Sequence, residues 1–254
     1  DFCKAIFQKM GIAEDAALLA SKVLVSADLR GIDSHGVARL KGYFRLWEAE
    51  RVNPKPDYRI IHETPTTATM DADASLGLTA APYAMDIAIN KAKEYGSGWV
   101  SVQNSNHFGI AGYHAMKALP HDMIGVAMTN ASPLVAPTFS TDRMLGTNPI
   151  AVAIPAGEEP AFVADFATTT AANGKLEILQ RQNKEAPEGW IQNKNGHNSK
   201  NPYELKDGGA LLPLGSDYLH GSHKGYCLGS IVDIFSAVFS GANYGPFAPP
   251  FVSF

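Results

Sequence analysis

Three side chains near the N-terminus, His35, Arg39 and Tyr43, recur at intervals of four residues. The Asp-Ser pair before His35 is a good N-cap, because its side-chain oxygens can accept a free N–H of a first helical turn. The apolar pattern that follows predicts one continuous helix up to an Asn-Pro pair, with the three side chains on one face. An imidazole, a guanidinium one turn away and a phenol could act on a small carboxylate substrate. The alternative is that His35 only caps the helix and that Arg39 is solvated.

A second candidate, His107, lies between a predicted strand at residues 99–103 and a glycine-spaced helix. Strand ends are favoured positions for catalytic groups in α/β proteins. Gly109 and Gly112 each weaken a helix by about 1 kcal/mol relative to alanine, so we expect a packed strand or a ligand to approach the backbone there. The alternative is that His107 is a polar turn residue.

The histidine spacing does not favour a metal site. His107, His114 and His121 recur every seven residues, which places them roughly 10 Å apart along a helix axis, too far apart to share one ion. His220 and His223 are three residues apart and could chelate, but no cysteine or acidic triplet accompanies them. A metal-dependent hydrolase is therefore the least favoured interpretation.

Two segments could hold a phosphate or a ribose. A predicted strand at residues 162–165 leads through a run of threonines into a helix predicted from about residue 170 to 180, whose free N–H groups could bind an anion. Lys224 lies in a glycine-flanked turn. The alternatives are a capping cluster and a surface lysine. The glycines at residues 96–98 do not form a Rossmann fingerprint, because they follow a helix and precede a strand.

The composition limits the class of protein. The chain has 254 residues, 45% of them hydrophobic and 18% charged, with a formal net charge of −4. These values are typical of a globular protein, and they argue against a nucleic-acid or anionic-membrane partner. Only Cys3 and Cys227 are present, which suits a reducing, cytoplasmic location. No apolar run approaches the roughly 20 residues of a membrane span, and no signal peptide is recognisable. The aromatic-rich stretch at the end suggests an incomplete polypeptide.

The pattern predicts an α/β (α+β) fold with a small helical unit at residues 1–55 and a sheet-and-helix domain at residues 56–254. The expected elements are a helix at 13–30 with Leu18 facing inward, a hairpin at 57–73, a helix at 79–95, strands at 99–103, 123–128 (buried), 150–154 and 162–165, a polar excursion at 182–212, and a last helix from 221 whose part at 231–239 is buried and closed by Gly241.

Seven short motifs occur in one order along the chain. They are Asp33-Ser34-His35-Gly36 with Arg39, Asn106-His107-Phe108-Gly109, Leu145-Gly146-Thr147-Asn148-Pro149-Ile150, Asp165-Phe166-Ala167-Thr168, Pro187-Glu188-Gly189-Trp190, Lys224-Gly225-Tyr226 and Gly245-Pro246-Phe247. Together they resemble the malate/L-lactate dehydrogenase family of non-Rossmann type, whose relatives include ureidoglycolate, sulfolactate, diketogulonate and cyclic-imine oxidoreductases. The chain departs from that family at His223, where an aromatic residue is common.

The resemblance implies an oxidoreductase that interconverts a small 2-hydroxy acid and its 2-oxo acid, with NAD or NADP as cofactor and a homodimer as the working form; from the histidine spacing we expect no metal. It also implies a non-Rossmann dehydrogenase fold with a largely antiparallel sheet domain for the cofactor. A cyclic 2-imino acid reductase and a non-catalytic small-molecule-binding homodimer are the alternatives.

The same resemblance implies roles for individual residues. His35 is expected to donate the proton with Ser34 as its orienting partner, and His107 is an alternative acid or base. Arg39 is expected to hold the substrate carboxylate, with Tyr43 and Thr147 as further substrate contacts. The expected cofactor contacts are His107, Phe108, Gly109, Asp165, Phe166, Ala167, Thr168, Thr169, Thr170, Ala171, His223 and Lys224.

Overall fold

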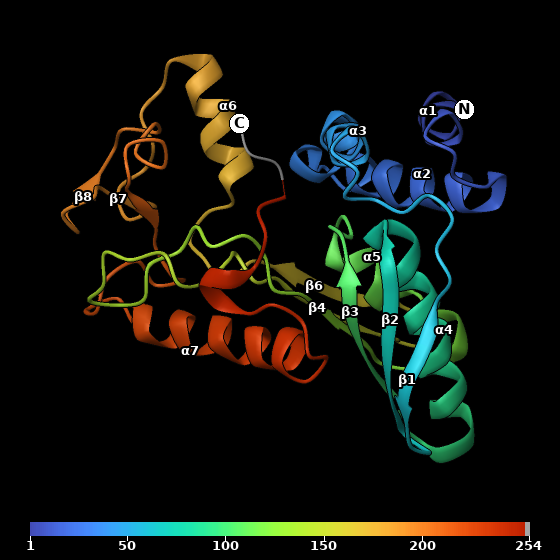
Figure 1. The fold of residues 1–254 in the computed structure, drawn as a ribbon. Coiled ribbons are helices and arrows are strands. Elements are labelled where there is room, and N and C mark those ends of the chain that lie inside the picture. Colours follow the sequence, from blue (N-terminus) through green and yellow to red (C-terminus); the bar gives the residue numbers. More distant parts are fainter. Residues whose placement is uncertain (252–254) are drawn as a thin grey trace.

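The computed structural model describes residues 1–251 and shows a mixed α/β fold with small sheets (Figure 1). Its α-helices are α1 (Phe2–Lys9), α2 (Glu14–Leu29), α3 (Leu40–Glu48), α4 (Gly77–Tyr95), α5 (Ala111–Met116), α6 (Asn173–Gln182) and α7 (Ser222–Asp233). The short helical turns are η1 (Asp33–His35), η2 (Val37–Arg39), η3 (Leu119–His121), η4 (Ile234–Val238) and η5 (Gly245–Phe247). Within the described residues, no helix combines the length and apolarity that a membrane crossing requires.

Within residues 1–251, nine strands form three small sheets. They are β1 (Arg59–Glu63), β2 (Thr67–Ser75), β3 (Trp99–Ser105), β4 (Gly125–Met128), β5 (Ile150–Ile154), β6 (Phe162–Phe166), β7 (Ile191–Gln192), β8 (Asn198–Ser199) and β9 (Ala210–Leu211), in the orders β1-β2-β3, β4-β5-β6 and β8-β7-β9. The predicted hairpin is confirmed, because β1 and β2 pair antiparallel. The parallel pair is β2 and β3, which α4 connects, and the pairs of the other two sheets are antiparallel.

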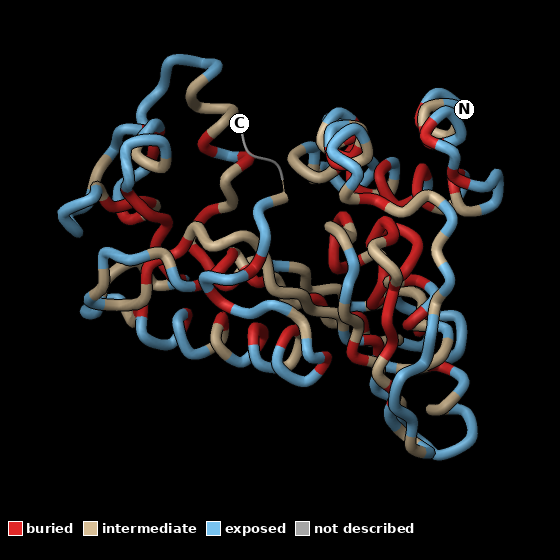
Figure 2. Tube along the Cα trace, in the orientation of Figure 1, coloured by how far each residue is buried: buried red, intermediate tan, exposed pale blue. Residues whose placement is uncertain are grey.

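Helices α1 to α3 lie together at the carboxyl ends of β2 and β3 (Figure 1). Their buried side chains, which include Phe7, Leu24 and Tyr43, pack against Leu78 at the start of α4. Figure 2 shows buried residues both in these helices and in the strands below them. The expectation for Leu18 was wrong, since its side chain is 42% exposed. The result is a helical layer set directly above the strand end from which His107 emerges.

The predicted continuous helix from the Asp-Ser cap to the Asn-Pro pair is wrong. Gly36 has φ −86° and ψ −149°, which interrupts the helix between η1 and η2. The cause is Asp28 on α2, whose carboxylate accepts the backbone N–H of Val37 at 2.9 Å. An ideal Cβ on Gly36 would lie 1.7 Å from an oxygen of that carboxylate. The contact with Asp28 therefore divides the predicted single helix, so that the two short turns η1 and η2 precede α3.

Other differences lie in the second half of the chain. The last helix is not buried over residues 231–239, because Ile231, Ile234, Val238 and Phe239 are each 44–57% exposed. The strand predicted at 123–128 is only partly buried, with Val126 41% exposed. The helix predicted from residue 170 begins later, with α6.

Candidate active site

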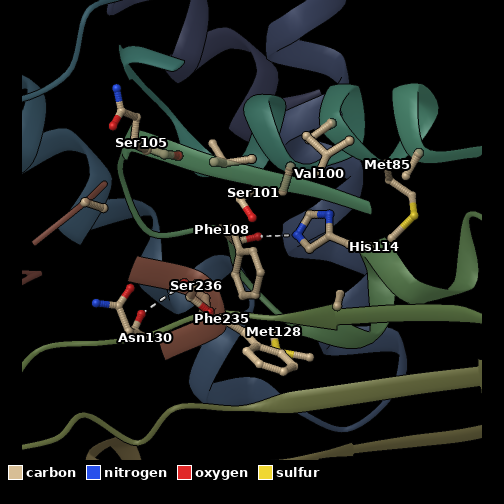
Figure 3. Close-up of a pocket in the computed structure, with 18 of the residues that line it drawn as sticks. Met85, Val100, Ser101, Ser105, Phe108, His114, Met128, Asn130, Phe235 and Ser236 are labelled. Carbon is tan, nitrogen blue, oxygen red and sulfur yellow. Dashed lines mark hydrogen bonds between the residues drawn. The ribbon is translucent and has the colours of Figure 1, made fainter. Parts of the chain in front are cut away.

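A cleft of about 1230 Å³ lies between β3 and β4. Its walls come from both strands and the residues that follow them, from α4 and α5, and from η4 (Figure 3). Its lining includes His35, His107, Thr147 and Phe251, of which His107 follows the carboxyl end of β3. The two histidines nominated from the sequence thus share one cleft.

His35 and His107 lie face to face, with ring centroids 5.7 Å apart and planes 21° apart. His35 belongs to the turn η1, and His107 follows β3. The two histidines are far apart in the sequence. Their rings meet because the helical layer packs on the strand ends.

Two hydrogen bonds to Nδ1 fix the orientation of the His107 ring. Its Nδ1 lies 2.7 Å from the Tyr43 hydroxyl and accepts the backbone N–H of Gly109 at 3.2 Å. Since a backbone N–H can only donate, Nδ1 carries a lone pair, and the neutral ring holds its proton on Nε2. Phe251 packs on the same ring at 4.4 Å between centroids. Nε2 is therefore the atom of this ring that is left to serve a ligand.

Tyr43 does not reach the cleft. Its side chain is fully buried, and its hydroxyl bonds the His107 ring. The expectation of a direct substrate contact from Tyr43 is not met in this structure, because its one polar group is engaged with His107 and its ring is buried in the core.

Both facing imidazoles are neutral at neutral pH. Burial, with the nearby Arg39 charge, lowers the pKa of His35 to about 4. Burial also holds the pKa of His107 well below its usual range, helped by His35, Arg39 and His114. The Ser34 hydroxyl lies 2.9 Å from Nδ1 of His35. The Ser34 contact therefore uses Nδ1 of that ring and not Nε2. The pair can accept a proton from a ligand, and His107 can donate a hydrogen bond to one.

Arg39 holds the turn that carries His35. Its Nε donates to the Ser34 carbonyl at 2.5 Å, and its Nη2 lies 3.4 Å from a carboxylate oxygen of Glu177 on α6. Its side chain is 18% exposed, and it is not part of the cleft lining. The guanidinium is thus held between the Ser34 carbonyl and Glu177, next to the turn that carries His35.

Among the expected cofactor contacts, Phe108 and Gly109 line the cleft with His107. The close approach expected at the two glycines is explained by packing. A Cβ on Gly109 would meet Val23 at 2.8 Å, and one on Gly112 would meet the Asp165 carboxylate at 2.7 Å. Asp165 accepts the Gly112 N–H at 2.8 Å, so in this structure its carboxylate joins β6 to α5.

The threonine run after Asp165 is turned toward the backbone. The hydroxyl of Thr168 donates to the Thr147 carbonyl, and that of Thr169 to the Ala171 carbonyl. The Thr170 hydroxyl lies 3.3 Å from the Leu212 carbonyl. None of the residues from Asp165 to Ala171 lines the cleft, and neither do His223 and Lys224 in the first turn of α7.

No group of three or more His, Cys, Asp or Glu side chains that could hold a metal ion occurs within residues 1–251. His220 bonds Asp217 at 2.8 Å, and Cys3 and Cys227 are free thiols.

Sequence reasoning missed three participants. Glu177 pairs with Arg39, Phe251 covers His107, and His114 lies buried in the cleft wall. Glu177 and Phe251 reach the site by contacts with residues far away in the sequence, which no local signal marks, whereas His114 bonds the carbonyl of Phe108 six residues before it. Phe251 belongs to the aromatic-rich stretch near the end of the chain, and its ring packs on those of His107 and Tyr43.

Comparison with known proteins decides the family. The model of the malate/L-lactate dehydrogenase family matches residues 1–253. The chain belongs to this family. It is 46% identical to a malate dehydrogenase of Pyrococcus horikoshii over 97% of this chain and 68% of that protein. It is 39% identical to the L-sulfolactate dehydrogenase of Methanocaldococcus jannaschii, over 94% of this chain and 67% of the relative.

A solved family structure agrees with this fold. The crystal structure of malate dehydrogenase from Entamoeba histolytica superposes with a TM-score of 0.93 at 40% identity, covering 96% of this chain and 70% of that one. The mixed α/β architecture with small sheets is therefore that of the family's dehydrogenases, as the motifs implied.

Proposed function

We propose that this family member interconverts a small 2-hydroxy acid and its 2-oxo acid, using NAD or NADP. The observation that carries the proposal is the facing pair of neutral histidines, His35 and His107, in a cleft of a dehydrogenase fold. Oxidation of a hydroxyl to a carbonyl needs a base for the hydroxyl proton, and a neutral imidazole is suited to that task.

His35 takes the proton in this proposal. Its Nδ1 faces the Ser34 hydroxyl at 2.9 Å, so a proton on Nδ1 can be donated to Ser34 while the lone pair of Nε2 accepts the substrate proton. In the direction of reduction the same atom returns the proton to the developing alkoxide. An anionic substrate beside the ring stabilises the protonated form, which raises the pKa of His35 toward neutrality when substrate is bound.

His107 orients the reacting oxygen. With Nδ1 occupied by Tyr43 and Gly109, its Nε2–H donates a hydrogen bond to the hydroxyl or carbonyl oxygen of the substrate. A fixed donor at the atom where negative charge develops stabilises the transition state. Tyr43 acts through His107 as a positioning residue.

Arg39 is proposed to attract and hold the substrate carboxylate. The contact between its Nη2 and Glu177 is 3.4 Å long, which is outside the range of strong charge-assisted hydrogen bonds. In this proposal the guanidinium leaves Glu177 and turns toward the His35 end of the cleft when a substrate carboxylate binds. Thr147, in the cleft lining, is proposed as a further substrate contact.

The cleft fits the reactive end of a nicotinamide cofactor. The ring of Phe108 lines the cleft (Figure 3), and flat aromatic faces stack favourably. When bound, the cofactor supplies the hydride donor or acceptor. His107, Phe108 and Gly109 would hold this end. The roles proposed for residues 165–171, His223 and Lys224 stay predictions, because these residues stand outside the cleft.

A homodimer is proposed as the working form. Its support is a set of exposed apolar side chains in α7, in η4 and directly after η4, namely Ile231, Ile234, Val238 and Phe239. Large apolar patches on soluble proteins commonly mark association sites. Light scattering of the purified chain at micromolar concentration tests this point, and a monomer mass would contradict it.

A substrate panel tests the proposed reaction. The chain is mixed with NADH or NADPH and, in separate assays, oxaloacetate, pyruvate and a cyclic 2-imino acid, while nicotinamide absorbance is followed. We expect loss of absorbance with a 2-oxo acid. Turnover of the imino acid alone would favour the imine reductase. No turnover and no thermal shift with either cofactor would overturn the proposal, since saturation at 100 times the dissociation constant adds about 2.7 kcal/mol of stability.

A further inference from the structure

Glu177 on α6 meets the guanidinium that is proposed to hold the substrate carboxylate. One of its carboxylate oxygens, Oε2, lies 3.4 Å from Nη2 of Arg39. Glu177 and a substrate acid therefore offer the guanidinium the same chemical group. We propose that Glu177 is an internal competitor of the substrate, which pairs with Arg39 in the free protein and so determines how tightly 2-oxo and 2-hydroxy acids bind. This inference rests on the carboxylate contact of Arg39 in the proposed function.

The Glu177 carboxylate is held in place from its own helix. Its other oxygen, Oε1, accepts a hydrogen bond at 3.0 Å from the side-chain amide of Asn173, one turn earlier on α6. Residues four apart lie on one face of a helix, so this bond leaves Oε2 for the guanidinium. The Glu177 side chain is 24% exposed, whereas that of Glu188, which also faces a cation, is 72% exposed. Glu177 is therefore a positioned carboxylate and not a freely rotating surface charge.

The first turn of α6 closely approaches the turn that carries His35. An ideal Cβ on Gly174 would lie 2.8 Å from Nη2 of Arg39 and 2.9 Å from Cβ of Ser34. Glycine weakens a helix relative to alanine, and here it leaves the room that the guanidinium and η1 occupy. Gly174 thus lets α6 bring Glu177 within reach of Arg39.

Displacement of Glu177 by a substrate acid leaves Arg39 paired. One ion pair is broken and another is formed, so the guanidinium keeps a carboxylate partner throughout, whereas a neutral ligand cannot make this exchange. The contact that breaks is longer than a strong charge-assisted hydrogen bond, which favours the exchange. The negative charge of Glu177 should therefore weaken the binding of acids and leave the binding of neutral analogues unaffected.

Oxamate and oxamide test the inference without turnover. Oxamate is a non-reactive carboxylate of about the size of pyruvate, and in oxamide an amide replaces that carboxylate. Each is titrated into the chain with saturating NADH or NADPH, and NMR follows the side-chain N–H signal of Arg39, which is recognised by its absence in Arg39→Lys. In Glu177→Gln we expect the Kd of oxamate to fall about fivefold, the upper range for partly exposed ion pairs, and the Kd of oxamide to stay the same.

Glu63→Gln is the matched control. Glu63 on β1 also pairs with a cation, since it lies 2.8 Å from the ammonium of Lys91, and it is not part of the cleft lining. Its substitution removes the same charge from the chain and should leave the Kd of oxamate unchanged. With a 2-oxo acid that is turned over, KM in Glu177→Gln should fall by the same factor as the Kd of oxamate, with kcat unchanged.

The outcomes separate this inference from the proposed reaction. An unchanged or higher Kd of oxamate in Glu177→Gln would overturn the inference, and so would equal tightening of oxamide or equal tightening in Glu63→Gln. No response of the Arg39 signal to oxamate in either protein would overturn it as well. Tighter oxamate binding in Glu177→Gln alone, without turnover of any 2-oxo acid, would support the inference and count against the proposed reaction.

Discussion

Replacement of Tyr43 by phenylalanine removes one hydroxyl and leaves the buried ring in place. That hydroxyl lies 2.7 Å from Nδ1 of His107. The Phe7 ring, at 6.3 Å between centroids, and the rest of the surrounding core can still pack against the substituted ring. The variant therefore tests whether Tyr43 acts by holding His107 in place.

The size of the effect follows from what remains on His107. Its Nδ1 keeps the Gly109 N–H at 3.2 Å, so the atom is not left without a partner, and the cost is that of one net hydrogen bond, about 1 kcal/mol. If the loss falls on the transition state, that energy corresponds to about a fivefold decrease in kcat/KM. The Gly109 contact also keeps the ring proton on Nε2, so we expect the same tautomer in the variant.

The assay combines kinetics with NMR of the histidine ring nitrogens. We expect kcat to fall about fivefold with KM for the cofactor unchanged, and the His107 ring to keep its Nε2–H form. Tyr58→Phe is the matched control, because its hydroxyl makes a similar bond to Thr79 at 3.0 Å away from the histidines. It should cost similar stability and leave kcat unchanged. Wild-type kcat in Tyr43→Phe would refute a positioning role, and a loss above about 100-fold would show that Tyr43 takes part in the chemistry.

Three further predictions concern Arg39, acidic pH and Gly36. Arg39→Lys should raise KM for the 2-oxo acid more than it lowers kcat, because an ammonium cannot make the two-pronged contact with a carboxylate; an unchanged KM would argue against the proposed carboxylate contact. Burial lowers the pKa of His35 and of His114 to about 4 each, so the unfolded chain binds protons that the folded chain does not between about pH 6.5 and 4. The free energy of unfolding should then fall on acidification through this range, by about 1.4 kcal/mol per pH unit for each such histidine. Denaturant titrations should show a shallower slope in His114→Gln, and an equal slope would contradict the assignment. Gly36→Ala should destabilise the fold by about 1–3 kcal/mol through the clash with Asp28, and the double variant with Asp28→Ala should recover part of that loss in thermal unfolding.

The sequence predicted elements well where the pattern is local. The helix α4 and the strand β3 appear near the expected residues because an apolar repeat runs between clear glycine stops, and Gly96 adopts the left-handed conformation that ends α4. The helix expected over His35, Arg39 and Tyr43 failed because its interruption depends on Asp28 from another helix. No local pattern could report that contact. The division at residue 55 stays a prediction.

The candidate site shows the same limit. His35 and His107 could be nominated from residue type and motif, and their common cleft follows from the packing of the helical layer on the strand ends. The role of Tyr43 could not be predicted, since it depends on a hydrogen bond across 64 residues of sequence. Nor could the pairing of Arg39 with Glu177, which is set by the position of α6.

The central claim is that the His35 imidazole carries the proton while His107 orients the substrate oxygen. A comparison of kcat for His35→Asn and His107→Asn with the best 2-oxo acid tests it most directly. The account predicts a decrease of about 100-fold or more for His35→Asn, with cofactor affinity unchanged, and a smaller decrease for His107→Asn, because asparagine can still donate a hydrogen bond. Near-complete loss in His107→Asn together with nearly normal turnover in His35→Asn would contradict it and would assign the proton to His107.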